Sequence, residues 1–403
     1  MEPYIKRELM NAILGVAVGD ALGVPVEFKS RKYLEQNPVT DMLGTSFRSA
    51  GTFSDDTAMT LCTLASLQEN HWELNPHDIM TKFLQWCDNG YMAVDGDVFD
   101  IGITTRNALT RFRNGLPLEQ CGSTSFYECG NGSLMRIMPI VFYLHQQCFE
   151  IDKYEIVKQV SALTHAHDVC TIGCYIYVML CHEMLNVGTC DPVDKKSLFK
   201  DKLPEIYKEL SMRVDQKWLD LYARIFDVES FINLPVDEIK SDGYIVNSLE
   251  AALWCFLNTD DYRTCVLKAV NLGSDSDTTA AIAGGIAGIY YDLGWKKGIP
   301  EEWLDRLRNK ELITKLCGIC VMTKREQLEY DVKHSTGITK EFAVRLLDEY
   351  LTQDLVLQKI DDYYEYFGEC FPTFGSSREQ IINHIDDCIA KKEPMKLRDD
   401  VIY

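Results

Sequence analysis

The sequence is short of basic residues. Its 403 residues include 41 Lys and Arg against 61 Asp and Glu, which gives a formal net charge of −20. A protein that binds nucleic acid through its phosphates, or an anionic membrane surface through a basic patch, needs charge of the opposite sign. The composition therefore argues against nucleic acids and membrane surfaces as partners.

Regular cysteine spacing and long hydrophobic runs are also missing. The 15 cysteines are odd in number and irregularly spaced, which is typical of reduced thiols in a cytoplasmic protein. The N-terminus lacks the basic-then-apolar pattern of a signal peptide. The apolar stretch at residues 12–28 is interrupted by Asp20 and Glu27. We expect no membrane-spanning segment and a cytoplasmic location.

What the sequence does have is helical periodicity. Residues 57–67, 169–185 and 246–257 carry apolar side chains at the spacing of helices buried on most sides. Strictly alternating stretches are scarce, so the pattern predicts an all-α protein. The glycine-rich segment 280–288 is best interpreted as a central core helix, because glycine disfavours a helix interior unless other backbones approach closely.

No linker rich in Pro, Gly or Ser divides the chain. Residues 188–240 are more polar and charged, which is typical of a surface insertion. Beyond residue 311 a helical apolar stripe continues, with pairs of acids outside it. We expect one helical domain over residues 1–311, with a possible insertion at 188–240, and a helical extension over 312–403 that packs on the core.

Two short acidic clusters each precede an apolar helix. They are Ser54-Asp55-Asp56-Thr57 and Ser274-Asp275-Ser276-Asp277-Thr278-Thr279. Such residues cap helices, but one cap needs only one of them. Mg²⁺ and Mn²⁺ prefer the carboxylate and hydroxyl oxygens that both clusters offer. If packing brings the two clusters together, they predict a site for two divalent metal ions.

Two further segments leave alternatives open. Glu27 follows a helix that ends near Gly23, and it is either solvated or directed into a site. The segment from Gly130 to Arg136 has the glycines of a phosphate-binding loop, with a helix expected to follow and present its free N–H groups. Gly-Asn-Gly is also an ordinary turn.

Seven motifs occur in an order that resembles the ADP-ribosylglycohydrolase family, the type named for the dinitrogenase-reductase-activating glycohydrolase. The resemblance covers about residues 8–308. The motifs are Gly19–Gly23 with Glu27, Gly51–Thr57, Asp100–Thr105, Gly130–Arg136, Thr164–His165, Gly243–Val246 and Asp275–Ala281.

The resemblance implies a single orthogonal bundle of α-helices that holds two Mg²⁺ or Mn²⁺ ions and cleaves the bond between ADP-ribose and an acceptor. By motif position, the implied metal ligands are Ser54, Asp55, Asp56, Asp275, Asp277 and Thr278. The implied catalytic residues are Glu27, Asp55, Asp56 and Asp100. The implied substrate-binding residues are Glu27, Gly130, Asn131, Gly132, Ser133, Met135, Arg136, His165, Gly243 and Tyr244.

The segment that begins at Asp100 resembles the arginine-directed branch of the family, in which this aspartate faces the acceptor. A carboxylate suits the planar fork of a guanidinium. The alternative is that Asp100 caps the helix after it. We favour ADP-ribosyl-arginine over serine-linked, O-acyl or nucleic-acid-linked ADP-ribose.

Two other functions stay open at this point. The chain could hydrolyse free small-molecule ADP-ribose derivatives, or it could be an immunity or other binding protein of the same fold. The expected partner is accordingly an ADP-ribosylated protein or an ADP-ribose derivative, and we expect a monomer.

Overall fold

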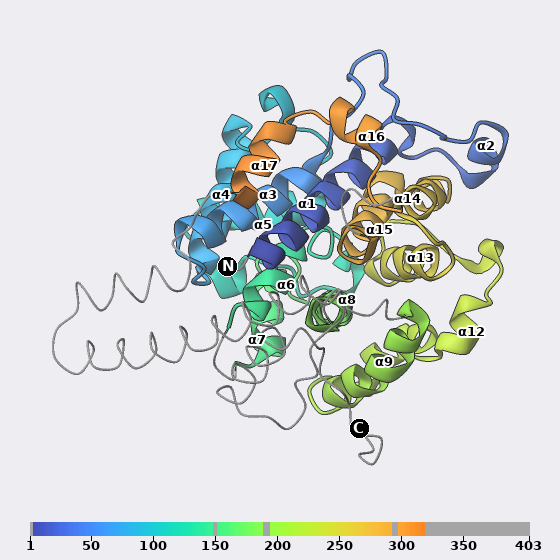
Figure 1. Cartoon of the computed structure of the whole chain (residues 1–403). Helices are drawn as coiled ribbons and strands as arrows, with labels where there is room; N and C mark the ends of the chain where they lie inside the picture. Colours follow the sequence, from blue (N-terminus) through green and yellow to red (C-terminus); the bar gives the residue numbers. More distant parts are fainter. Residues whose placement is uncertain (1–2, 148–150, 188–193, 292–296, 319–403) are drawn as a thin grey trace, which may run out of the picture. The chain divides into compact units, whose positions relative to one another are not determined.

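The computed structural model describes residues 3–147, 151–187, 194–291 and 297–318 (Figure 1). Within these ranges the chain is helical, with no β-strand and two isolated bridges, Ser123 to His165 and Gly130 to Tyr244. The all-α prediction is confirmed for the described chain. The expected C-terminal extension lies outside the described residues from 319 onward.

The longest connections between consecutive α-helices in the described ranges are residues 37–54 and 114–137. The bounds of the helices are α1 Pro3–Gly23, α2 Arg31–Gln36, α3 Asp55–Glu69, α4 Pro76–Asn89, α5 Ile103–Arg113, α6 Met138–His145, α7 Lys153–Ala162, α8 Asp168–Val187, α9 Lys195–Ser211, α10 Gln216–Leu219, α11 Ala223–Phe226, α12 Val228–Ile232, α13 Ile245–Leu257, α14 Tyr262–Val270, α15 Ser276–Tyr291, α16 Glu301–Arg306 and α17 Lys310–Gly318.

Three of the predicted helices are confirmed with small shifts at their ends: α3, α8 and α13. Nearly every residue of α3 and α13 is buried. That burial explains why their apolar residues do not form a narrow stripe. The expected surface insertion corresponds, from residue 194 to 240, to α9–α12 and a last short turn.

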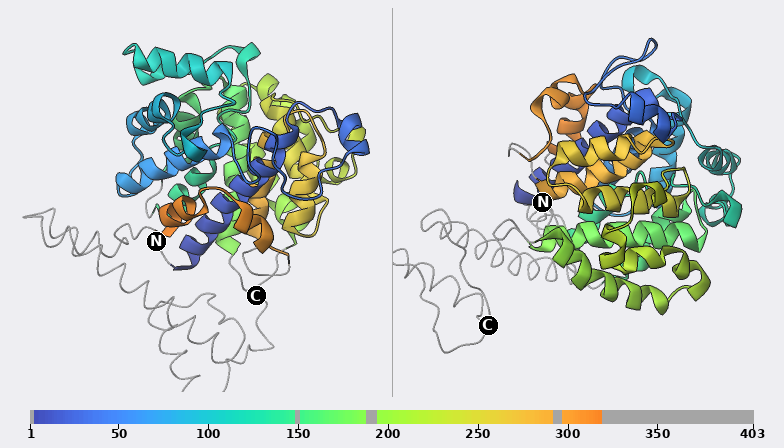
Figure 2. Two further views of the ribbon diagram at one scale, coloured as in Figure 1. Left: turned by 90° about the horizontal axis from the view of Figure 1, so that it is seen from above. Right: turned by 90° about the vertical axis from the view of Figure 1, so that its right-hand side faces the viewer.

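The glycine-rich helix α15 lies in the core, as predicted, and packs along α1 through small residues (Figure 2). A Cβ atom added at Gly284 would collide with the Gly15 carbonyl oxygen, and one added at Gly288 would collide with that of Asn11. The two backbones therefore approach so closely that only glycine fits at these positions. This contact determines where the N-terminus of α15 lies relative to the C-terminus of α1.

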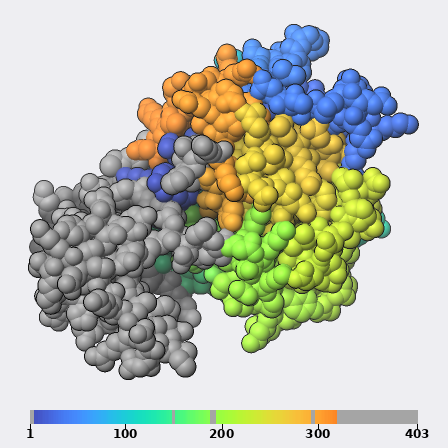
Figure 3. All heavy atoms as spheres, turned by 45° about the vertical axis from the view of Figure 1, so that its right-hand side comes forward, coloured from blue at the N-terminus to red at the C-terminus, as the bar shows by residue number. Residues whose placement is uncertain are grey.

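The segment between α1 and α3, in blue, lies beside the yellow and orange parts of the chain that contain α14 and α16 (Figure 3). The Arg31 guanidinium donates to the Leu272 carbonyl oxygen at 3.1 Å, and the Trp303 indole donates to the Asp41 carboxylate at 2.7 Å. These contacts anchor the connection that leads into α3, and with it the first acidic cluster.

In the described part of the chain, two helical segments are long and apolar enough to cross a membrane by length and composition alone, Ile5–Val26 and Asp168–Asn186. Of their most apolar windows, 78% and 89% respectively lie buried inside the structure. Packing within the bundle accounts for the apolar character of both segments, which is what a core helix requires.

Candidate active site

The two acidic clusters meet at the N-termini of α3 and α15. Thr278 lies 222 positions after Asp56, yet its hydroxyl donates to Asp56 Oδ2 at 3.3 Å. Gly23, the last residue of α1, packs so tightly on Asp277 that a Cβ there would collide with the Asp277 backbone. The expected meeting of the two clusters is therefore what the structure shows, and α1 is the element that brings them together.

Helix capping accounts for only part of the first cluster. Ser54 is the N-cap of α3, and its Oγ accepts from the Asp56 backbone N–H at 3.3 Å. The same hydroxyl donates to Asp56 Oδ2 at 2.9 Å. Asp56 Oδ1 and Asp277 Oδ2 are buried and have no hydrogen-bond partner. Buried carboxylate oxygens are costly when unpaired, so these two atoms are candidate ligands for a cation.

Glu27 and Asp100 complete the cluster. Carboxylate oxygens of Glu27, Asp275 and Asp277 lie within 4.8 Å of one another, so Glu27 is directed into the site. Burial, followed by neighbouring carboxylates that include Asp100, raises the pKa of Glu27 and of Asp277, which places the Asp100 carboxyl close to both. The alternative that Asp100 caps the next helix is wrong, because α5 begins at Ile103 with Gly102 as its N-cap.

Asp20 belongs to the same cluster and was not among the predicted site residues. Its side chain is completely buried, and oxygens of Asp20, Asp56 and Asp277 lie within 4.8 Å of one another. Its carboxylate accepts from the Ser54 N–H at 2.9 Å, the Thr57 N–H at 3.0 Å and the Thr57 hydroxyl at 2.6 Å. An aspartate of α1 thus holds the start of α3. In the sequence, this role of Asp20 was indicated by the position of a charged residue inside a long apolar helix.

Replacing Asp20 with Asn should loosen this attachment. The amide turns an NH₂ group toward backbone N–H donors, so at least one charge-assisted hydrogen bond is lost and a donor is left unpaired. We expect a destabilisation of about 2–4 kcal/mol and an affinity for Mn²⁺ about tenfold lower. Urea unfolding and a Mn²⁺ titration measure the two effects. Wild-type values for both would contradict this role.

The carboxyl groups of the cluster repel one another. Burial, followed by the charge of Asp100, raises the pKa of Glu27 to about 9. Burial raises the pKa of Asp20 to about 6. Burial also raises the pKa of Asp56 and Asp277 well above the usual range, with neighbouring carboxylates as the next causes. A divalent cation would offset both the repulsion between these carboxylates and the cost of burying their charge. The oxygen donors present fit Mg²⁺ or Mn²⁺.

The raised pKa values determine how metal removal should affect stability. An acid whose pKa is higher in the folded state binds protons more tightly there. The metal-free folded protein should therefore lose stability as the pH rises above about 4.5, the usual value, through 9, the value for Glu27. We expect the Tm in EDTA to fall between about pH 5 and 9 relative to the Tm in Mg²⁺. If the Tm changes with pH in the same way in EDTA and in Mg²⁺, the result would contradict a metal site.

The glycine loop lies beside the second cluster. The Asn131 N–H donates to the Gly243 carbonyl oxygen at 3.0 Å, and the Asn131 amide donates to Asp275 Oδ2 at 2.6 Å. A Cβ added at Gly132 would lie 2.8 Å from His165 Cε1. The structure thus brings together Gly130, Asn131, Gly132, His165, Gly243 and Tyr244. The prediction of a helix directly after the loop is wrong, because α6 begins only at Met138 after a series of turns.

Other predicted binding residues lie beneath the loop. The Arg136 side chain is completely buried; it donates to Thr164 Oγ1 at 2.9 Å and packs 4.6 Å from the Phe83 ring centroid. Ser133 is completely buried as well, next to Cys174 and Ser161. Met135 is also buried. These contacts make Arg136 and Ser133 supports of the loop, and direct contact with a ligand would require them to leave their partners.

His165 supports the loop as a neutral ring. Burial, with Arg136 as the second cause, lowers its pKa to about 3. Its Nδ1 lies 2.8 Å from Thr164 Oγ1. At neutral pH this side chain can therefore form a hydrogen bond with a ligand, but it brings no positive charge. Arg136, which is buried beneath the loop, and His165 therefore bring no accessible positive charge to an anionic ligand.

Comparisons with known proteins agree with this geometry. Residues 1–330 match the family model described as ADP-ribosylglycohydrolase. An ADP-ribosylarginine hydrolase Tri1 from Pseudomonas putida is 32% identical over 309 residues, 76% of each chain. A protein of the same name from Serratia proteamaculans is 31% identical over 312 residues, again 76% of each chain. A solved structure titled ADP-ribosylglycohydrolase-related protein complex has 27% identity and a TM-score of 0.62; the match covers 78% of this chain and 96% of that one.

Proposed function

The chain belongs to the ADP-ribosylglycohydrolase family, and we propose that it removes mono-ADP-ribose from arginine side chains of proteins in a reaction that needs divalent metal ions. The family membership makes it a hydrolase that acts on glycosidic bonds. The observation that carries the proposal is the convergence of both acidic clusters with Glu27 and Asp100 on one buried point.

We assign two Mg²⁺ or Mn²⁺ ions to this point. The residues that would hold them are Ser54, Asp55, Asp56, Asp275, Asp277 and Thr278. The unpartnered oxygens of Asp56 and Asp277 support the assignment. When bound, such ions supply Lewis-acid chemistry, in which they hold the ribose diol and lower the pKa of a bound water.

The chain's own residues supply the rest of the mechanism. The loop at Gly130–Gly132 and the neutral His165 hold the diphosphate and ribose. Glu27 positions the attacking water. Positive charge develops at the anomeric carbon as the bond to the acceptor breaks, and the nearby carboxylates stabilise it. We propose direct hydrolysis without a covalent intermediate.

The assignment of arginine as the acceptor is supported by the position of Asp100 and by the names of two relatives. Both relatives compared above carry the name ADP-ribosylarginine hydrolase. A guanidinium is cationic and planar, so a carboxylate at its docking point recognises its charge and its shape. Asp100 does not cap α5, and its side chain is only partly buried, so its carboxylate can meet an acceptor at the edge of the acidic cluster.

Release of ADP-ribose from two peptides tests the proposal. One peptide is mono-ADP-ribosylated on arginine and the other on serine, and each is incubated with Mg²⁺, Mn²⁺ or EDTA. We expect release from the arginine peptide alone and none in EDTA. Release from neither peptide, with ADP-ribose still bound, would replace the proposal with a binding protein. Release from the serine peptide would move the acceptor assignment away from arginine.

We also propose a cytoplasmic location. The described cysteines, most of them buried, are all free thiols, which supports a reducing compartment.

A further inference from the structure

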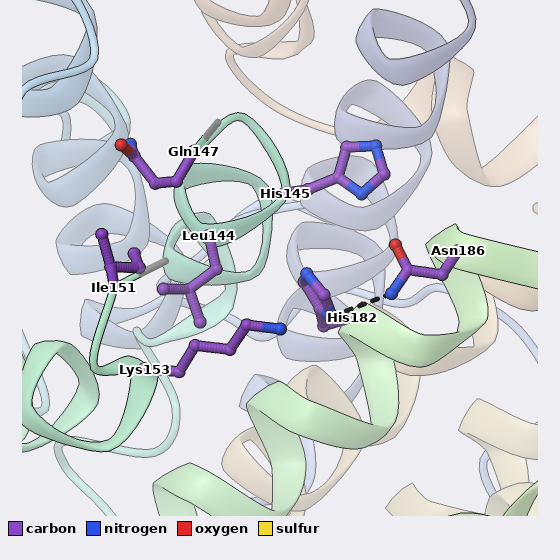
Figure 4. A pocket seen from close by; sticks show the side chains of 7 residues that line it. All are labelled: Leu144, His145, Gln147, Ile151, Lys153, His182 and Asn186. Carbon is purple, nitrogen blue, oxygen red and sulfur yellow. Dashed lines mark hydrogen bonds between the residues drawn. The ribbon is translucent and has the colours of Figure 1, made fainter. Parts of the chain in front are cut away.

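A second polar pocket lies away from the acidic cluster. It has a volume of about 310 Å³ and lies between the end of α6, the start of α7 and the C-terminal part of α8. Its side chains are shown in Figure 4. They are Leu144, His145, Gln147, Ile151, Lys153, His182 and Asn186. His182 lies 14 residues into α8 from Asp168, which is roughly 20 Å along the helix from the end near His165.

The polar side chains of this pocket are mostly hydrogen-bond donors. The Lys153 ammonium group points toward His182, and the Asn186 amide nitrogen lies 3.1 Å from His182 Nδ1 (Figure 4). The His145 and His182 ring centroids are 6.0 Å apart. None of the seven lining residues is a carboxylate. In a chain with a net charge of −20, such a concentration of donors is unusual.

Three carboxylates that flank the lining residues in the sequence already have cationic partners. Asp152 pairs with Arg213 at 2.8 Å, and Glu155 pairs with Lys158 at 3.7 Å. Glu183 lies 3.5 Å from His182 Nδ1, but it also pairs with Lys202 at 3.3 Å. Among the described residues, no carboxylate forms an ion pair with Lys153. The Lys153 ammonium group is therefore available to a ligand.

The lining distinguishes between kinds of ligand. A divalent cation would meet the Lys153 ammonium group and would find no carboxylate in the lining. An apolar ligand would find only Leu144 and Ile151. A phosphate-type anion matches an ammonium group, two imidazole rings and two side-chain amides, all of which can donate hydrogen bonds. The volume exceeds what a single halide ion needs.

We propose that this pocket binds a small phosphate-type anion, either free phosphate or the phosphate group of a mononucleotide. Lys153 supplies the fixed charge, and His145, His182 and Asn186 supply hydrogen bonds. The site is separate from the acidic cluster, so it adds a ligand to the enzyme without depending on the reaction proposed above.

Imidazole NMR of the full-length, Mg²⁺-loaded protein tests the proposal locally. The Cε1–H signals of His145 and His182 are assigned from the variants His145→Gln and His182→Gln. Inorganic phosphate is then titrated, and AMP in parallel. We expect both signals to move, because a bound anion changes the surroundings of both rings and accepts hydrogen bonds from them. Tighter binding of AMP would identify a nucleotide as the source, and equal affinities would identify the phosphate group itself.

Three lysine variants sharpen the test. Lys153→Met should weaken phosphate binding about tenfold, because one charge-assisted contact is lost. Lys153→Arg should retain it. Lys158→Met, on the same helix and half-exposed, should bind within about twofold of wild type. The proposal is overturned if the two histidine signals do not move up to about 10 mM phosphate, or if Lys153→Met binds as well as Lys158→Met does.

Discussion

Asp277→Asn is expected to stop turnover and, at the same time, to stabilise the metal-free protein. The loss of a metal ligand removes charge stabilisation of several kcal/mol from the transition state, so kcat should fall about 1000-fold or more. Without metal, however, Asp277 is a completely buried carboxylate. Burial and the charges of Asp56, Asp275, Glu27 and Asp100 disfavour its ionised form. Asparagine keeps the Oδ1 atom that accepts from the Thr278 N–H and removes the charge.

Two measurements check this prediction, and a matched variant controls for the helix position. ADP-ribose release gives the rate, and the Tm in EDTA gives the stability. Asp78 is also an acid in the first turn of a helix, and its Oδ2 accepts from Ser66. Asp78→Asn should leave turnover intact and lower the Tm slightly, because the favourable interaction with the helix dipole is lost. Normal turnover of Asp277→Asn would contradict the metal site, and a lower Tm in EDTA would contradict the repulsion.

Asp100→Asn is expected to lose activity on the arginine-linked peptide while it still binds ADP-ribose. The amide cannot pair ionically with a guanidinium, so kcat/KM should fall about 100-fold or more. Binding of ADP-ribose itself should change far less, because the loop at Gly130–Gly132 and His165 are untouched. This separation would distinguish an acceptor-side residue from a residue that merely maintains the fold.

Asp95 offers a control for the backbone at Asp100. Both residues have a left-handed conformation, with φ values of 52° and 62° respectively, and asparagine tolerates that region. Asp95 pairs with Arg308 at 2.8 Å instead of with carboxyl groups. Asp95→Asn should therefore keep full activity. Equal losses in both variants would point to the backbone of this loop, and loss of ADP-ribose binding in Asp100→Asn would contradict an acceptor role.

The helices could be predicted because their signals are local. Apolar spacing located α3, α8 and α13 to within a few residues, and the serine before Asp55 marked the start of α3. The structure of the loop after Gly130 was harder to predict. Its glycines predicted a close approach to an anion, which stays a prediction, and Gly132 packs against the His165 ring. The helix expected behind it does not start until Met138, because residues 131–137 form turns.

Positions that depend on distant partners could not be predicted. Arg136 was expected to meet an anion, but it lies in the core beside Thr164 and Phe83. Asp20 interrupts an apolar helix and lies in the first of the seven motifs, but its attachment to α3 could not be predicted, because its partners, Ser54 and Thr57, come from another helix. An isolated charge in an apolar stretch gives no indication of which donors will surround it.

The sequence by itself determined the all-α class, the helix starts at the acidic clusters and the chemistry that those clusters offer, because each is encoded in a few consecutive residues. The order of seven motifs also identified the family. Only the tertiary structure decided that Glu27 and Asp100 share one point with both clusters, that Asp20 holds α3, and that Arg136 is buried. The meeting of the two clusters follows from the contact of α1 with α15, where the glycines allow two backbones to approach. The burial of Arg136 follows from its contacts with Thr164 and Phe83. Each of these contacts joins residues far apart in the chain, so no local pattern encodes it.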